Sequence, residues 1–140
     1  MSTTTIMEND HITLYYHHDK QMVHHIYKPG IGGQTFKDGL LNGLEWMKKH
    51  KAVKWLSDNH LIEGHSDEES QWVNDVWLPK AIAAGWKYWA LVVPSSVKGR
   101  MNMNEFMEMF FEKGVRVMVF TEPDEAMEWL ETINKEAQPG

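Results

Sequence analysis

The densest group of side chains able to bind a metal ion lies in one polar segment. Five residues there carry an imidazole or a carboxylate: Asp58, His60, Glu63, His65 and Asp67. Zinc accepts both ligand types, and a catalytic zinc site needs three protein ligands and one open position. The spacing differs from the His-x-x-Glu-His and His-Glu-x-x-His patterns, which present their ligands on a helix. The segment has two interpretations. It is a polar connecting loop, or it forms the metal site of a metal-dependent hydrolase that uses His60, Glu63 and His65.

The other histidines also suggest metal chemistry. All eight lie in the first half of the chain, five of them in two β-like runs that predict a hairpin. Antiparallel pairing puts His17 and His24 on one face as diagonal neighbours, about 7 Å apart. His18 and His25 point to the other face, and His11 lies roughly 20 Å from His17 along its strand. Because three rings cannot meet, we expect ordinary strand residues here, with His25 partly buried.

The sequence lacks the usual signals of nucleophilic catalysis. The absence of cysteine excludes thiolate ligands, disulfides and cysteine nucleophiles. No Gly-x-Ser-x-Gly elbow occurs, and Gly30-Ile31-Gly32-Gly33 precedes no phosphate-binding Lys-Ser/Thr. Paired acids such as Asp67-Glu68-Glu69 fit a helix N-terminus, where the helix dipole favours them. We expect no catalytic residues and no cofactor, and a function other than catalysis is favoured.

Methionine, phenylalanine and tryptophan offer apolar surface. In the predicted helix over 104–113, several positions at helical spacing can face a core, which leaves Met109 or Phe111 outside it. Met-rich surfaces adapt to varied ligands, although core packing is their more frequent role. Trp72 and Trp77 point about 140° apart around a helix, so one of them is expected to line a groove or a dimer contact.

The elements that must position these residues follow the order β-β-α-β-α-β-α-β-α. Residues 1–10 are polar and predict a loose lead-in, 11–134 a single domain, and 135–140 a C-terminal tail. The predicted strands cover 11–18, 21–28, 52–56, 88–93 and 115–120. Right-handed crossovers make the later strands parallel, so we expect an α/β fold with a mixed sheet of about five strands. Gly39 and Gly43 beside an apolar stripe predict close approach of the first helix to this sheet.

Local signals mark the helix ends. Thr35 with Asp38, and Ser66 with Glu69, match the spacing of a capping box that opens a helix. Pro79 lies inside the second helix, where proline removes a backbone hydrogen bond and crowds the preceding turn. We therefore expect a kink or a break just before it.

Several strings within residues 10–133 resemble the SpoIIAA-like or STAS domain family. They are Lys54-Trp55-Leu56-Ser57-Asp58-Asn59, Gln71-Trp72-Val73 through Trp77-Leu78-Pro79, Ala81-Ile82-Ala83-Ala84-Gly85 before Trp89-Ala90-Leu91-Val92-Val93-Pro94, and Asp124-Glu125-Ala126-Met127-Glu128-Trp129-Leu130. The resemblance implies this sheet with helices packed mainly on one face. Looser relatives are similar to lipid-carrying Sec14-type domains, which implies an apolar ligand.

Regulatory members of that family carry an Asp-Ser-Ser/Thr-Gly signature whose second hydroxyl a partner kinase phosphorylates. This sequence has Ser57-Asp58-Asn59-His60 near that place, so the resemblance carries no phosphorylation site over. Phosphorylation of Ser57 or Ser66 is kept only as a third hypothesis.

Charge and hydropathy restrict the kinds of partner that the chain is expected to bind. The net charge of −6 is shared equally by the two halves, so no basic face is expected to bind nucleic acid. No apolar run reaches the roughly 18 residues of a membrane span. The N-terminal residues lack the features of a signal peptide, which predicts a cytoplasmic protein.

In open α/β sheets, ligands meet the carboxyl ends of the parallel strands. The predicted ligand- or partner-binding residues combine the polar residues at these strand ends with apolar side chains expected at the surface. They are Ser57, Asp58, Asn59, His60, Ser95 and Ser96, together with Trp72, Trp77 and Met109. We interpret the chain as a non-enzymatic STAS-like binding or regulatory module that recognises a protein partner or a small apolar ligand. A homodimer stays open as one of its assemblies.

Overall fold

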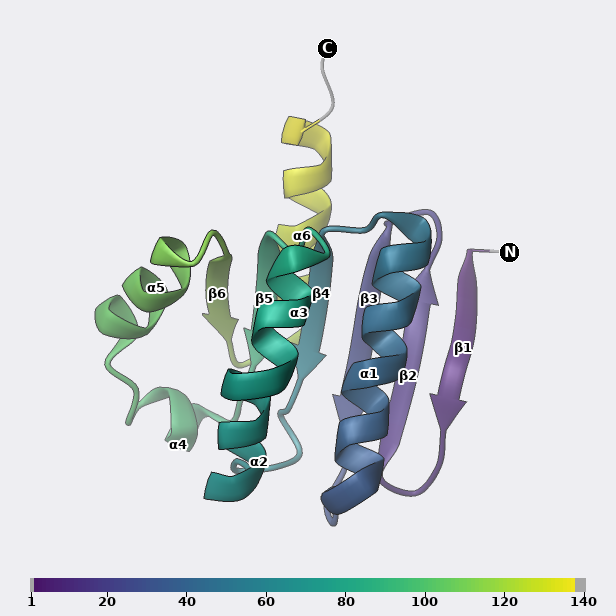
Figure 1. The fold of residues 1–140 in the computed structure, drawn as a ribbon. Coiled ribbons are helices and arrows are strands. Elements are labelled where there is room, and N and C mark those ends of the chain that lie inside the picture. Colours follow the sequence, from purple (N-terminus) through teal and green to yellow (C-terminus); the bar gives the residue numbers. More distant parts are fainter. Residues whose placement is uncertain (1, 138–140) are drawn as a thin grey trace.

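Six strands form one mixed sheet, and their spatial order equals their order along the chain (Figure 1). The computed structural model describes residues 2–137. The strands are β1 (Thr3–Glu8), β2 (Ile12–His17), β3 (Met22–Tyr27), β4 (Lys54–Asp58), β5 (Tyr88–Val92) and β6 (Arg116–Phe120). Neighbours are antiparallel from β1 to β3 and parallel from β3 to β6. The predicted α/β class with a mixed sheet is confirmed.

The N-terminal segment belongs to the sheet, so the expected loose lead-in over residues 1–10 is wrong for β1. This strand pairs with β2, and its register shifts between Thr5 and Met7. Threonine is β-branched and suits a strand, but a polar edge strand shows no apolar alternation that would reveal it. At the other end, the last helix runs to Ala137, which places residues 135–137 of the expected tail in a helix. Residues 138–140 lie outside the described residues.

Helices cover the two faces of the sheet unequally (Figure 1). They are α1 (Gly33–His50), α2 (Asp67–Trp72), the π-helical turn η1 (Val73–Trp77), α3 (Leu78–Ala83), α4 (Ser95–Lys98), α5 (Met103–Glu112) and α6 (Pro123–Ala137). The front face carries α1, the α2-η1-α3 segment and α5. On the back face, α6 packs on β4, β5 and β6. The helices therefore lie mainly on one face, as the resemblance to the STAS family implies.

Each face has its own hydrophobic core. The front core holds the largest buried side chains, among them Trp55, Tyr16 and Phe36. Here α1 approaches the sheet closely, because a Cβ on Gly43 would overlap the ring of Trp55. The smaller back core joins Met22, Leu56, Ala90 and Val92 to Ala126 and Leu130 of α6. The close approach of the first helix is thus confirmed.

One of the two predicted capping boxes is present. Ser66 and Glu69 exchange hydrogen bonds at the start of α2, each 3.1 Å long. The box expected at Thr35 and Asp38 is wrong, because α1 begins at Gly33 and has no side-chain cap of its own. The backbone N–H of Gly33 instead donates to Oε2 of Glu69 at 3.0 Å.

The irregularity expected before Pro79 is the π-helical turn η1. Proline has no N–H to donate to the carbonyl of Asp75, and its ring crowds that turn. Widening the turn relieves the conflict, so α2 and α3 remain one continuous helical segment. The predicted break is thus a bulge within the helix.

Candidate functional site

Hydrogen bonds inside the protein occupy polar groups that the sequence places at the carboxyl end of β4. Ser57 is buried, and its hydroxyl accepts a hydrogen bond from the indole N–H of Trp89 at 2.8 Å. Asn59 is paired through Oδ1 with Nε2 of His25 at 3.0 Å. The backbone N–H of Asn59 donates to the carbonyl of Val92 at 2.8 Å. These contacts hold the end of β4 against its neighbours and use the groups that a polar ligand would need.

The predicted zinc ligands do not converge. Nδ1 of His60 contacts the carboxylate of Asp58, while Glu63 is exposed. His65 packs against Phe36, with their ring centres 4.6 Å apart, and burial lowers its pKa. Among the residues that the structure describes, no group of three or more His, Asp or Glu side chains is placed to hold a metal ion. The hydrolase hypothesis therefore gains no geometric support.

The remaining predicted binding residues are dispersed. Trp77 lies in the front core, and its indole N–H donates to the carbonyl of Leu40 at 2.8 Å. Trp72 is half-buried on the outside of the helical segment, next to α1. Ser95 and Ser96 are exposed on the short helix α4. These four side chains do not form one site.

The edge strand β6 has the features of a docking surface. Within the described part of the chain, no strand pairs with its outer side. Its five-residue register with β5 is unbroken, whereas the opposite edge, β1, contains the shift between Thr5 and Met7. Bulges are one device that blunts sheet edges against further pairing. The backbone N–H and C=O groups on the outer side of β6 therefore remain available to another strand.

A groove with a cavity of about 400 Å³ opens beside this edge. We call it the edge groove, and it is lined by Met107, Glu108, Phe111, Arg116, Val117, Met118 and Trp129. These residues come from α5 on the front face, from β6 itself and from α6 on the back face (Figure 1). Except for Glu108 and Arg116, the lining side chains are apolar. The groove therefore offers apolar surface beside a strand whose outer side pairs with no other strand in the described part of the chain.

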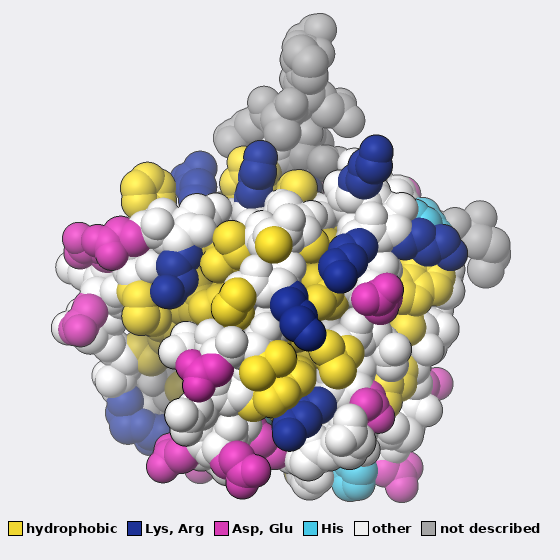
Figure 2. Space-filling model, in the orientation of Figure 1, with side chains coloured by type: hydrophobic (Ala, Val, Ile, Leu, Met, Phe, Trp, Pro, Cys, Tyr) yellow, Lys and Arg dark blue, Asp and Glu magenta, His cyan; other side chains and the backbone are white. Residues whose placement is uncertain are grey.

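Exposed apolar side chains lie on α5, the helix that forms the front wall of the groove. Phe111 is 68% exposed and Met109 is 46% exposed, so both lie outside the core, where the sequence predicts at least one. Figure 2 shows hydrophobic side chains gathered on the helical face, including its α5 side. The excess of methionine and phenylalanine on α5 was the sequence signal for this surface. Arg116, Met118 and Trp129 had no such signal, because their meeting depends on α6 crossing to the back face.

Comparisons with protein-family models, with curated proteins and with solved structures find no match to this chain. Among residues 2–137, no helix is long and apolar enough to cross a membrane. The resemblance to the STAS family therefore stays a prediction. Among the features described above, the edge groove has the geometry of a docking surface.

Proposed function

We propose that this protein is a non-enzymatic binding module of STAS-like type that recognises a protein partner through the edge groove. One observation carries the proposal: an apolar groove runs beside a sheet edge that is free of bulges and that no other strand among residues 2–137 pairs with. An extended segment of a partner can join such an edge as a further strand. Backbone hydrogen bonds then supply affinity, and the pockets beside the strand supply specificity.

The lining of the groove defines the chemistry of that segment. Side chains of an added strand would point alternately toward α5 and toward α6. Met107 and Phe111 meet them on the front, and Trp129 meets them on the back. Because Glu108 is the only charged side chain that α5 and α6 contribute to the lining, the segment needs apolar residues at consecutive positions. Arg116 favours an acidic residue at one end of the segment, since a guanidinium binds a carboxylate through paired hydrogen bonds.

The size of the groove supports a small apolar ligand as the second candidate. Its volume of about 400 Å³ lies within the range of small-molecule sites, roughly 300–1,000 Å³. Such sites usually enclose most of their ligand, whereas this groove lies along an open sheet edge. A peptide segment uses the unpaired backbone of β6, which an apolar small molecule leaves without hydrogen bonds. The peptide is therefore the favoured ligand.

The proposal is tested by titrating the protein with short synthetic peptides that carry one acidic residue followed by consecutive Val, Ile or Leu. We expect saturable binding, lost when a central proline replaces one apolar residue, because proline has no N–H and disfavours strand pairing. Phe111→Asp should weaken binding by at least about tenfold, which corresponds to about 1.4 kcal/mol. Leu61→Asp is the matched control, since Leu61 is 48% exposed and lies outside the groove lining.

Three results would overturn the proposal. They are absence of binding by every peptide, equal binding of the proline-containing peptides, and an equal loss in the Leu61→Asp variant. Mass spectrometry of protein purified without detergent tests the second candidate. A copurified apolar molecule that the peptide displaces would indicate that the groove binds a small apolar ligand. Sedimentation of the protein alone tests a second copy as the occupant. If the protein is a dimer and the Phe111→Asp variant is a monomer, the occupant of the groove is a second copy of this chain and not a different protein.

A further inference from the structure

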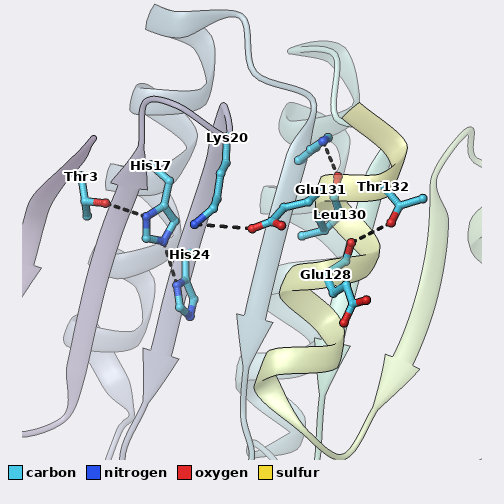
Figure 3. Close-up of polar contacts among 9 residues, drawn as sticks. Thr3, His17, Lys20, His24, Glu128, Leu130, Glu131 and Thr132 are labelled. Atoms are coloured by element: carbon cyan, nitrogen blue, oxygen red, sulfur yellow. Dashed lines mark hydrogen bonds and ion pairs between the residues drawn. The ribbon is translucent and has the colours of Figure 1, made fainter. Parts of the chain in front are cut away.

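Two histidines meet on the back face of the sheet, away from the edge groove (Figure 3). In the hairpin, Tyr15 pairs with His24 and His17 pairs with Met22, so His17 and His24 are diagonal neighbours, as predicted. The side chains lean together, and a hydrogen bond of 3.0 Å joins Nε2 of His17 to Nδ1 of His24. The ring centres are 5.3 Å apart, closer than the diagonal spacing of about 7 Å expected from the backbone.

The surroundings fix which nitrogen atoms face each other. Oγ1 of Thr3, on the neighbouring strand β1, lies 2.9 Å from Nδ1 of His17. This contact engages the outer nitrogen of His17 and turns its Nε2 toward His24 (Figure 3). The ring of Tyr15 lies 5.7 Å from each histidine ring and packs beside both. Three paired strands therefore hold the two facing nitrogen atoms in place.

We propose that His17 and His24 form a two-histidine binding site for a divalent late transition metal ion such as Cu²⁺, Ni²⁺ or Zn²⁺. Imidazole nitrogen suits these ions. Metal–nitrogen bonds of about 2.0–2.1 Å place two ligands at a right angle about 3 Å apart, which matches the observed separation. Small rotations of the rings would bring the two lone pairs to a common point. Water or an added anion would fill the other coordination positions.

The protonation state and the second contact of His17 support this assignment. Burial lowers the pKa of both side chains, so both are neutral at pH 7. The hydrogen bond between the facing nitrogen atoms places a proton on one of them. With the ring proton of His17 on Nδ1, beside Oγ1 of Thr3, both facing lone pairs are free for a metal ion and no proton is lost to solvent. Thr3 supplies the outer contact that commonly orients a metal-binding histidine. Nε2 of His24 is buried without a hydrogen-bond partner among the described residues. It can keep the ring proton while Nδ1 binds the metal.

The nearest charges set the strength of the site. Lys20, in the turn between β2 and β3, acts on both histidines as a positive charge. Its ammonium lies 3.5 Å from the carboxylate of Glu131 on α6, which offsets part of that charge (Figure 3). Asp19 in the same turn acts in the opposite direction on His17. Removing the charge of Lys20 should therefore tighten metal binding.

The test is calorimetric titration of the full chain, without an affinity tag, with Cu²⁺, Ni²⁺ and Zn²⁺ at pH 7. We expect one site, and a loss of more than about tenfold in affinity for His17→Ala and for His24→Ala. Thr3→Val should weaken binding less, whereas Lys20→Gln should strengthen it. His60→Ala is the control, because this exposed histidine lies in the loop after β4.

A second measurement needs no variant. Cu²⁺ bound by the wild-type protein should broaden the nuclear magnetic resonance signals of His17 and His24 first and show coupling to two imidazole nitrogens in its electron paramagnetic resonance spectrum. Binding no tighter than that of the double variant His17→Ala/His24→Ala, an equal loss in His60→Ala, or broadening centred on other histidines would overturn the site.

Discussion

The indole N–H of Trp55 donates a hydrogen bond to Nδ1 of His25, and the two nitrogen atoms lie 3.0 Å apart. This contact leaves the ring proton on Nε2, which donates to Oδ1 of Asn59. His25 also stacks on Tyr27, with ring centres 4.0 Å apart. Because the side chain is fully buried, its pKa is lowered to about 3. His25 thus connects β3, β4 and the loop after β4 as a neutral ring.

Acid should destabilise the protein through this residue. The unfolded chain binds a proton on His25 below about pH 6.5, whereas the folded protein does so only near pH 3. The contribution of His25 to the unfolding free energy is therefore complete above pH 6.5 and is lost as the pH falls toward 3. Urea unfolding between pH 7 and about pH 4.5 measures the effect.

His25→Gln is the companion variant for that experiment. It should be less stable than wild type at pH 7, because glutamine cannot reproduce the stacking on Tyr27, and its unfolding midpoint should change less with pH. An equal pH dependence in both proteins would show that His25 is not the responsible group.

Glu69 joins the beginnings of two helices. Its carboxylate accepts hydrogen bonds from the backbone N–H groups of Ser66 and Gly33. Burial raises the pKa of Glu69, but these hydrogen bonds outweigh that effect and the net pKa is lowered. Glu69→Ala should cost about 1–2 kcal/mol of unfolding free energy, the usual range for a lost helix cap. Glu68→Ala, one position earlier in α2 and exposed, should change stability by less than about 0.5 kcal/mol.

Gly43→Ala tests how closely α1 packs on the sheet, because the sign of the change in unfolding free energy depends on the space around Gly43. In an exposed helix, Gly→Ala stabilises by up to about 1 kcal/mol. A Cβ at Gly43 would instead overlap the ring of Trp55, so we expect Gly43→Ala to destabilise by about 1–3 kcal/mol. Asn42→Ala, at the exposed neighbouring position, is the control and should be neutral or stabilising. Thermal unfolding of both variants decides whether α1 lies as close to the sheet as described.

Phe111 should contribute little to folding despite its size. Its side chain is 68% exposed, so Phe111→Asp should change the unfolding free energy by less than about 0.5 kcal/mol. Phe110→Ala, at the buried neighbouring position, should cost about 3–5 kcal/mol. Similar losses for the two variants would indicate that Phe111 is part of the core and does not serve a partner.

Local sequence patterns predict most elements of this fold because their causes are local. Apolar periodicity marks β2 to β6, the Ser66–Glu69 box marks α2, and Pro79 marks the widened turn before it. The cap of α1 could not be predicted in this way, because Glu69 follows Gly33 by 36 residues. The sequence did not reveal the first strand either, because its two apolar residues, Ile6 and Met7, are adjacent at the register shift and show no alternation.

The candidate sites depend still more on three-dimensional arrangement. Pairing in the hairpin predicts that His17 and His24 are neighbours, but the Thr3 hydroxyl that contacts Nδ1 of His17 comes from the unpredicted first strand. The edge groove requires the strand order, which leaves β6 at an edge, and the passage of α6 to the back face. Ser57 and Asp58 were expected just after a strand over 52–56, but they form the last two residues of β4, and contacts within the protein engage Ser57 and Asn59.

Amide hydrogen exchange along β6, measured with and without the bound peptide, tests the central claim most directly. Pairing with an added strand gives new hydrogen-bond acceptors to those amides of β6 that point away from β5. We predict that exchange at these outward amides slows on peptide binding, while the exposed amides of α4 are unchanged. Saturable peptide binding that leaves exchange along β6 unaltered would contradict strand addition at the edge groove.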